Sequence, residues 1–242
     1  SLPTHPQLLD WLAKDFMEHD WDIKYLLKKI MLSATYQQSS IATEESKKAD
    51  PDNKWLSRAP RFRMSGEIIR DYVLATSGLL NREIGGPSVK PYQPPGLWEE
   101  TNAGGNRGVL TTYTADEGDK LYRRSLYTLW KRTLPPPSMS IFDAPNRDIC
   151  EVRRQKTNTP LQALALQNDV QMLEAARVLS ENTITDTKDA EQWVTTVFQR
   201  ILVRNPKEEE KKVLEEYYTD ALDKFLNDRE NAEKLIAQGE YK

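Results

Sequence analysis

Apolar side chains recur every three to four positions along most of the chain, which is the spacing of one face of an α-helix. Prolines, capping residues and one long stretch without periodicity divide this pattern into separate elements. The pattern predicts helices over residues 6–18, 23–34, 42–49, 66–80, 119–132, 160–181, 189–202, 208–226 and 229–238. The range 119–132 also alternates like a strand, but its helical neighbours favour a helix. The predicted fold class is therefore all-α, an irregular multi-helix bundle.

The stretch between residues 81 and 118 interrupts this helical pattern. It holds seven of the ten glycines and four of the fourteen prolines. A connection of this length is usually either a functional loop or a disordered insertion, and the aromatic residues Tyr92, Trp98 and Tyr113 disfavour disorder. We expect an ordered Gly/Pro-rich loop excursion packed on the helices, with Trp98 as an exposed platform for a ligand. The other tryptophans lie on apolar faces or at helix junctions, where core packing is expected; they are Trp11, Trp21, Trp55, Trp130 and Trp193.

Length and composition bound the domain organisation. The chain has 242 residues, of which 38% are hydrophobic, and its mean hydropathy of −0.71 is typical of a soluble protein. No run of about 18 apolar residues predicts a membrane span. We predict a single helical domain over residues 1–242, with an acidic helical extension from residue 206. The first residue is Ser1, not Met, which predicts that the chain is an excised part of a longer protein.

The net charge of −3 is distributed unevenly along the chain. Residues 121–160 carry eight Lys and Arg against three Asp and Glu, whereas residues 181–242 carry ten against fifteen. A short basic block within an acidic chain indicates an anionic ligand or an internal network of ion pairs, and it disfavours nucleic-acid binding.

The basic block overlaps the stretch 138–168, which carries the densest set of candidate binding groups. Its arginines could fork onto a carboxylate, sulfate or phosphate, assisted by the amide groups at the start of the helix at Pro160. The structural alternative is that Asp143 pairs with an arginine while Asn158 and Thr159 cap that helix. The candidate ligand-binding residues are Asp143, Asn146, Arg147, Arg153, Arg154 and Asn158 in this stretch, Tyr92, Trp98 and Glu99 in the excursion, and Arg63 and Glu67 near the 66–80 helix.

Catalytic and metal chemistry have weaker support. Cys150 is the single cysteine, no histidine is near it in sequence, and its neighbours Ile149 and Val152 predict a buried thiol. One cysteine and two histidines disfavour a zinc centre, and no haem-attachment motif is present. We therefore expect no cofactor in this segment and assign no catalytic residue; whether the chain is an enzyme stays open.

Eight motifs together carry a resemblance to a known family. They are HPQLLDWL at 5–12, SATYQQSS at 33–40, PRFRM at 60–64, GGPSV at 85–89, PYQPPGLWE at 91–99, YRRSLYT at 122–128, FDAPNR at 142–147 and RRQKTNTPLQAL at 153–164. As an ordered set they resemble the PSD-type C-terminal domain of unknown function found in large surface proteins of planctomycetes. The resemblance covers about residues 5–205, and the acidic end is less distinctive.

The resemblance implies an exported parent protein, in the periplasm or on the cell surface, in which cytochrome-c-like domains accompany this one and carry any haem. It also implies an association with carbohydrate-related modules, and it supplies no reaction. Two functions are open. The first is an accessory interaction module that binds an anionic or carbohydrate ligand or neighbouring domains of the parent chain. The alternative is a polysaccharide-related hydrolase with its site between the 92–100 loop and the 143–158 stretch.

Overall fold

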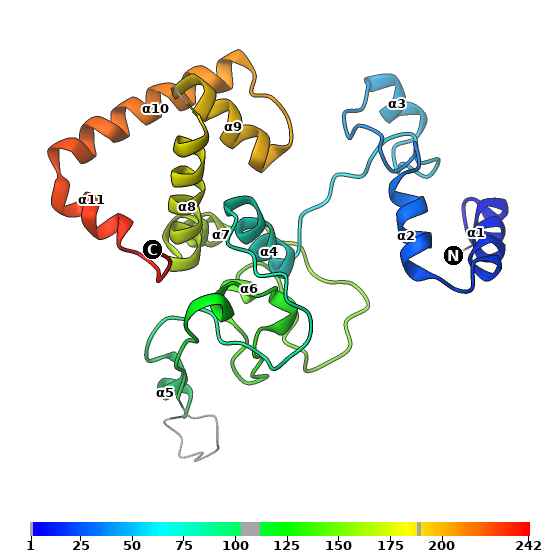
Figure 1. The fold of residues 1–242 in the computed structure, drawn as a ribbon. Coiled ribbons are helices and arrows are strands. Elements are labelled where there is room, and N and C mark those ends of the chain that lie inside the picture. Colours follow the sequence, from blue (N-terminus) through cyan, green and yellow to red (C-terminus); the bar gives the residue numbers. More distant parts are fainter. Residues whose placement is uncertain (1, 103–111, 188–189) are drawn as a thin grey trace. The chain divides into compact units, whose positions relative to one another are not determined.

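A computed structural model describes residues 2–102, 112–187 and 190–242 (Figure 1). Within these ranges the chain forms α-helices and two 3-10 helices, and it has no strand, which confirms the predicted all-α class. The elements are α1 (Pro6–Glu18), α2 (Ile23–Met31), α3 (Glu44–Ala49), α4 (Gly66–Ser77), α5 (Leu97–Asn102), η1 (Gly118–Tyr122), η2 (Ser125–Tyr127), α6 (Pro137–Ser140), α7 (Pro160–Asn168), α8 (Val170–Asp186), α9 (Ala190–Leu202), α10 (Glu208–Asn227) and α11 (Arg229–Ile236). None of the helices in the described ranges combines the length and the apolar character that crossing a bilayer requires.

Residue contacts divide the chain into two compact units, Ser1–Arg63 (unit 1) and Met64–Lys242 (unit 2). The single domain expected over 1–242 stays a prediction.

In unit 1, a buried carboxylate connects α1 to α2. Asp15 is 8% exposed, and its Oδ1 accepts a hydrogen bond of 2.5 Å from Lys29 Nζ. The α1–α2 connection turns through Asp20 and Trp21, both in the left-handed region, and Asp22 then caps α2 by accepting from the backbone of Lys24 and Tyr25. This cap explains why α2 begins where the sequence predicts.

In unit 2, α8 is the central helix and contacts α4, α7, α9 and α11 (Figure 1). A cluster of buried side chains from α4, the residues just after it, η1 and α8 forms its core: Leu74, Leu79, Leu121, Tyr122, Ala175 and Val178. Gly66 lets α4 approach α6 closely, because a Cβ atom there would lie 2.9 Å from the Met139 carbonyl oxygen.

The helix predicted over 119–132 is wrong. Two 3-10 turns occupy part of this range, and its remaining backbone pairs with the excursion. Val89 N–H donates to the Tyr127 carbonyl and Leu129 N–H donates to the Val89 carbonyl, both at 2.8 Å. The carbonyls of Leu121 and Arg123 accept from the Arg70 guanidinium. These tertiary partners replace the i→i−4 hydrogen bonds of a helix, and the bonds of Val89 also hold the described part of the excursion on the unit. Residues 103–111 of the predicted excursion lie outside the described residues.

The single helix predicted over 160–181 is divided at Asp169. The backbone of this residue is extended, and its side chain accepts from the amides of Gln171 and Met172 to start α8. Asp and Asn compete for backbone donors in this way, which favours a new N-cap over a continuous helix.

Several burial predictions are also wrong. Trp98 is 1% exposed and so is no open platform, whereas three tryptophans expected in the core are exposed. They are Trp11, Trp21 and Trp55, all in unit 1. Cys150, Ile149 and Val152 are exposed too, because the segment around them crosses the surface without a helix to bury its apolar side.

Candidate functional site

An apolar groove of about 1110 Å³ lies within unit 1. We call it the unit 1 groove. Its lining includes four aromatic rings, Trp11, Tyr25, Tyr36 and Phe62, together with aliphatic side chains of α1, α2 and the 56–62 segment. The cations Lys28, Lys29 and Arg58 complete it, and its described lining residues include no carboxylate.

Beside the groove, α2 leaves its apolar stripe exposed, and of that stripe only Ile30 also lines the groove. None of the nine residues of α2 is buried, and the side chains of Ile23, Leu27, Ile30 and Met31 are all exposed. An amphipathic helix ordinarily places such a stripe against another element. The stripe is therefore an apolar surface that unit 1 itself leaves uncovered.

Lys29 provides the fixed polar group of the groove. Its ammonium donates to Asp15 and, at 3.1 Å, to Tyr25 Oη, and it lies 4.4 Å from the centre of the Trp11 ring. The hydrogen bonds to Asp15 and Tyr25 raise the pKa of Lys29, so it stays protonated at neutral pH. Lys28, beside it, has an exposed side chain that can meet an anionic partner.

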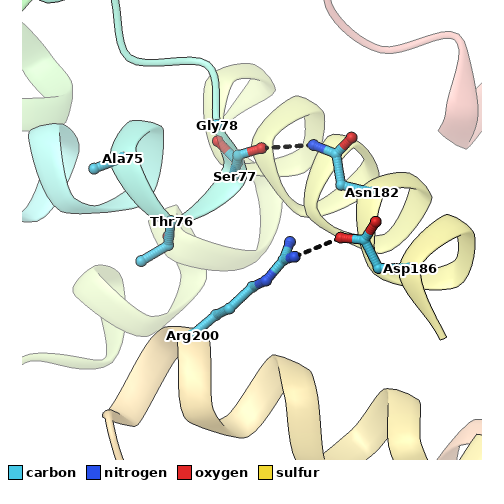
Figure 2. Close-up of a pocket in the computed structure, with 7 residues that line it drawn as sticks. All are labelled: Ala75, Thr76, Ser77, Gly78, Asn182, Asp186 and Arg200. Carbon is cyan, nitrogen blue, oxygen red and sulfur yellow. Dashed lines mark hydrogen bonds and ion pairs between the residues drawn. The ribbon is translucent and has the colours of Figure 1, made fainter.

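A second, open cleft of about 530 Å³ lies in unit 2, where the end of α4 meets α8 and α9 (Figure 2). Arg200 and Asp186 point toward each other across it and pair at 2.8 Å, and Asn182 donates to the Ser77 carbonyl at 3.0 Å. Because these polar groups are already hydrogen-bonded to one another, the cleft is a weaker candidate for a ligand site than the unit 1 groove.

The structure places Asp143 in a turn before α7. Its carboxylate accepts from Thr157 N–H at 2.7 Å and from Thr157 Oγ1 at 2.8 Å. Gln162, which is 1% exposed, donates to the same hydroxyl and to the Ile141 carbonyl, and forms a capping box with Thr159. Asp143 thus orders the approach to α7 through Thr157.

The arginines of the basic block lie in separate places. The Arg147 guanidinium stacks over the Trp130 ring at 4.1 Å, and Trp130 Nε1 donates to the Asn146 carbonyl at 3.3 Å. Arg154 pairs with Glu67 at 2.8 Å. Burial disfavours the charged form of Glu67, but its hydrogen bonds, including that from Arg154, outweigh burial and lower the pKa of Glu67.

The remaining predicted residues fall at different depths. Arg153, Asn158 and Glu99 are exposed, and Arg63 is half-buried. Tyr92 is also half-buried and donates to Glu174 Oε1 at 3.2 Å.

Trp98 forms a small core inside the excursion. Its Nε1 donates to Gln93 at 3.0 Å, its ring packs 5.1 Å from that of Tyr113, and Lys131 Nζ lies 4.4 Å from its ring centre. The tryptophan therefore holds the excursion together.

Sequence reasoning missed the buried polar residues of unit 2. Arg70, Arg123 and Glu174 are each 3% exposed or less and bind groups distant in sequence. Arg123, for example, donates to the Pro87 carbonyl at 3.0 Å and stacks on Tyr127, which fixes the glycine-rich start of the excursion. Local pattern carried no signal for these roles, since charged residues on helices are normally exposed.

Within the described ranges no cluster of three His, Cys, Asp or Glu side chains is arranged to hold a metal ion. A family model described as PSD1, protein of unknown function (DUF1553), matches residues 1–218. No curated protein and no solved structure matches the chain.

Proposed function

The chain belongs to the PSD1 family of proteins of unknown function, and from this premise we propose that it is an accessory interaction module. Its unit 1 groove binds an acidic amphipathic helix of a partner protein. The observation that carries this proposal is the exposed apolar face of α2 beside a groove lined by aromatic rings and cations.

The spacing of the exposed residues on α2 supports a helical partner. Ile23, Leu27, Ile30 and Met31 follow one another at four, three and one positions, which places them on one helix face. Such a face receives another helix by interdigitating side chains, the mode by which amphipathic helices are recognised in grooves.

Charge complementarity supports an acidic partner. Lys28, Lys29 and Arg58 place positive charge along the groove, and Asp15 neutralises part of it at Lys29. A partner with carboxylates beside its apolar face would approach faster and in one register, whereas a basic one would be repelled.

The geometry favours binding over the hydrolase alternative. A hydrolase of polysaccharides needs one carboxyl group with a raised pKa to donate a proton. Hydrogen bonds from its own backbone amide and from Arg154 lower the pKa of Glu67, and the Asp143 carboxylate is engaged by Thr157. Neither group has the environment of a general acid.

The test uses the full chain and a fluorescein-labelled peptide of about 18 residues, long enough to form a helix. The peptide carries Leu and Phe on one helical face and Glu on the other. Fluorescence anisotropy should show saturable binding, and the same peptide with Lys replacing every Glu should bind at least about tenfold more weakly. Equal binding of the two peptides, or binding of neither, would refute the proposal.

Two tryptophan substitutions locate the site. Trp11→Ala removes a ring from the lining and should weaken binding of the acidic peptide by about tenfold or more. Trp55→Ala is the matched control, because Trp55 is in the same unit and 67% exposed but does not line the groove. The proposal fails if both substitutions have the same effect.

We also propose a setting for the parent protein from the planctomycete-type resemblance. The parent is exported to the periplasm or cell surface, and neighbouring cytochrome-c-like domains carry its haem. Fractionation of cells that produce the whole parent protein tests this setting, and recovery of that protein in the cytoplasmic fraction would contradict it.

A further inference from the structure

Glu174 is a buried carboxylate in unit 2 with an unusual set of partners. Its side chain projects from α8 and is 0% exposed. Oε1 accepts from Tyr122 Oη at 2.9 Å, from Tyr92 Oη at 3.2 Å, and from the backbone amides of Glu240 at 2.7 Å and Tyr241 at 2.8 Å. Oε2 is buried and has no hydrogen-bond partner among the described residues. A buried carboxylate needs its donors, and half of them come from residues 239–241.

We call residues 239–241 the strap. Three of its recognition features are main-chain or aromatic. Two successive amides donate to Glu174, the Tyr241 carbonyl accepts from the Arg177 guanidinium, and the Tyr241 ring packs edge-on against Tyr122 at 6.2 Å. The site thus offers a carboxylate to the strap amides, a guanidinium to a strap carbonyl and an aromatic ring to the strap ring. Such a set of groups can bind a peptide segment.

Gly239 allows this close fit. Its φ of 86° lies in the left-handed region, and a Cβ atom there would come 2.3 Å from Glu174 Oε1. A larger residue at this position cannot enter without displacing a buried side chain. Gly118 N–H also donates to Glu240 Oε1 at 2.7 Å, so the site selects a glycine followed by an acidic and an aromatic residue.

The groups that receive the strap belong to the part of the chain that the family model matches. Tyr92, Tyr122, Glu174 and Arg177 all lie within residues 1–218, the range that the family model matches, and the strap lies beyond that range. Burial, together with the hydrogen bond to Glu174, raises the pKa of Tyr122, which keeps its hydroxyl a donor. The strap is at the surface, since Tyr241 is 46% exposed, so it can exchange with a competing segment.

We propose that Glu174, Tyr92, Tyr122 and Arg177 form a peptide-binding site for a glycine–acidic–aromatic segment of a partner protein. In the structure the strap occupies this site from within the chain. The proposal is independent of the unit 1 groove. Because a tethered occupant has an effective concentration near the millimolar range, a free peptide must compete with it.

The test uses the full chain and the labelled peptide acetyl-QGEYK-amide, whose sequence is that of residues 238–242. Gly239→Val prevents the strap from entering, so this variant should bind the peptide at least about tenfold more tightly than the unchanged chain does. Gly96→Val is the matched control, because Gly96 has a φ of 79° and open space around its Cβ position. It carries the same backbone strain and should leave peptide affinity unchanged.

Two further measurements make the outcome decisive. Adding Glu174→Gln to Gly239→Val should weaken peptide binding by about tenfold or more, since a buried charged acceptor is lost. A folded Gly239→Val variant that binds no peptide, or whose binding Glu174→Gln leaves unchanged, overturns the proposal. If Gly239→Val does not fold, hydrogen exchange decides in the unchanged chain: millimolar peptide must speed exchange of the Glu240 and Tyr241 amides, and no change overturns the proposal.

Discussion

Replacing Arg70 by methionine should destabilise unit 2 strongly, because its guanidinium connects three separate segments. Arg70 is 3% exposed on α4. Its Nε donates to Gln171 Oε1 at 2.6 Å, Nη1 donates to the Arg123 carbonyl at 2.7 Å, and Nη2 donates to the Leu121 carbonyl at 2.7 Å. Methionine has a similar volume but no donor, so the change isolates the polar contribution.

The magnitude follows from two opposing effects. Each hydrogen bond from a charged donor contributes about 1.5–3 kcal/mol, so three contribute about 4.5–9 kcal/mol. Burying the charge costs several kcal/mol, and this cost is visible because burial lowers the pKa of Arg70 to about 10 despite nearby Asp71 and Asp169. The Leu121 carbonyl keeps a hydrogen bond from Gln171 Nε2 at 3.2 Å in the variant. We expect a net loss of about 3–5 kcal/mol in the free energy of unfolding.

Hydrogen exchange measures this loss locally, which matters because two units can unfold separately. The amides of residues 118–128 report on unit 2. The control is Arg154→Met, which removes a surface pair with Glu67 whose arginine is 43% exposed and should cost about 0–1 kcal/mol. An Arg70→Met variant within about 1 kcal/mol of this control would show that the buried network contributes little net stability.

Three further predictions concern other positions. Gly66→Ala should lower the free energy of unfolding of unit 2 by about 1–3 kcal/mol, because the added Cβ meets the Met139 carbonyl at 2.9 Å; an unchanged value in urea denaturation would refute the close approach. The folded-state pKa of Glu67 is lowered, so its stabilising contribution is complete above about pH 4.5 and is lost as the pH falls through the lower folded value. Glu67→Gln should therefore flatten the dependence of the free energy of unfolding on pH below about pH 4.5. An unaltered dependence counts against the pairing with Arg154. Asp22→Ala should destabilise α2 by about 1 kcal/mol, measured by thermal denaturation followed by circular dichroism, whereas Asp22→Asn should restore most of it.

The helix starts were largely predictable because their signals are local. α1 occupies residues 6–18 as predicted, with Pro6 at its first position, and α10 and α11 begin at Glu208 and Arg229 as predicted. Caps and first-turn prolines act within about four residues. The same signals failed at Asp169, where a capping side chain inside an apolar pattern began a new helix.

The candidate site was less predictable. The Arg-rich approach to α7 drew attention because of its composition, yet Arg147 and Arg154 pair with different partners, Trp130 and Glu67. Conversely, the apolar face that the periodicity predicts on the 23–34 helix is exposed in the structure. Amphipathic periodicity identifies an apolar face and does not identify what covers it.

The sequence alone determined that the chain is helical, where most helices begin, and that the helical periodicity stops after α4. Only the tertiary structure decided which polar groups are buried, since Arg70 and Glu174 bind partners 51 or more positions away. It also decided that Trp98 is buried and Trp11 exposed. The physical reason is range: a helix start depends on a few neighbouring dihedral angles and one capping bond, whereas the burial of a charge depends on donors and acceptors that meet only when distant segments pack.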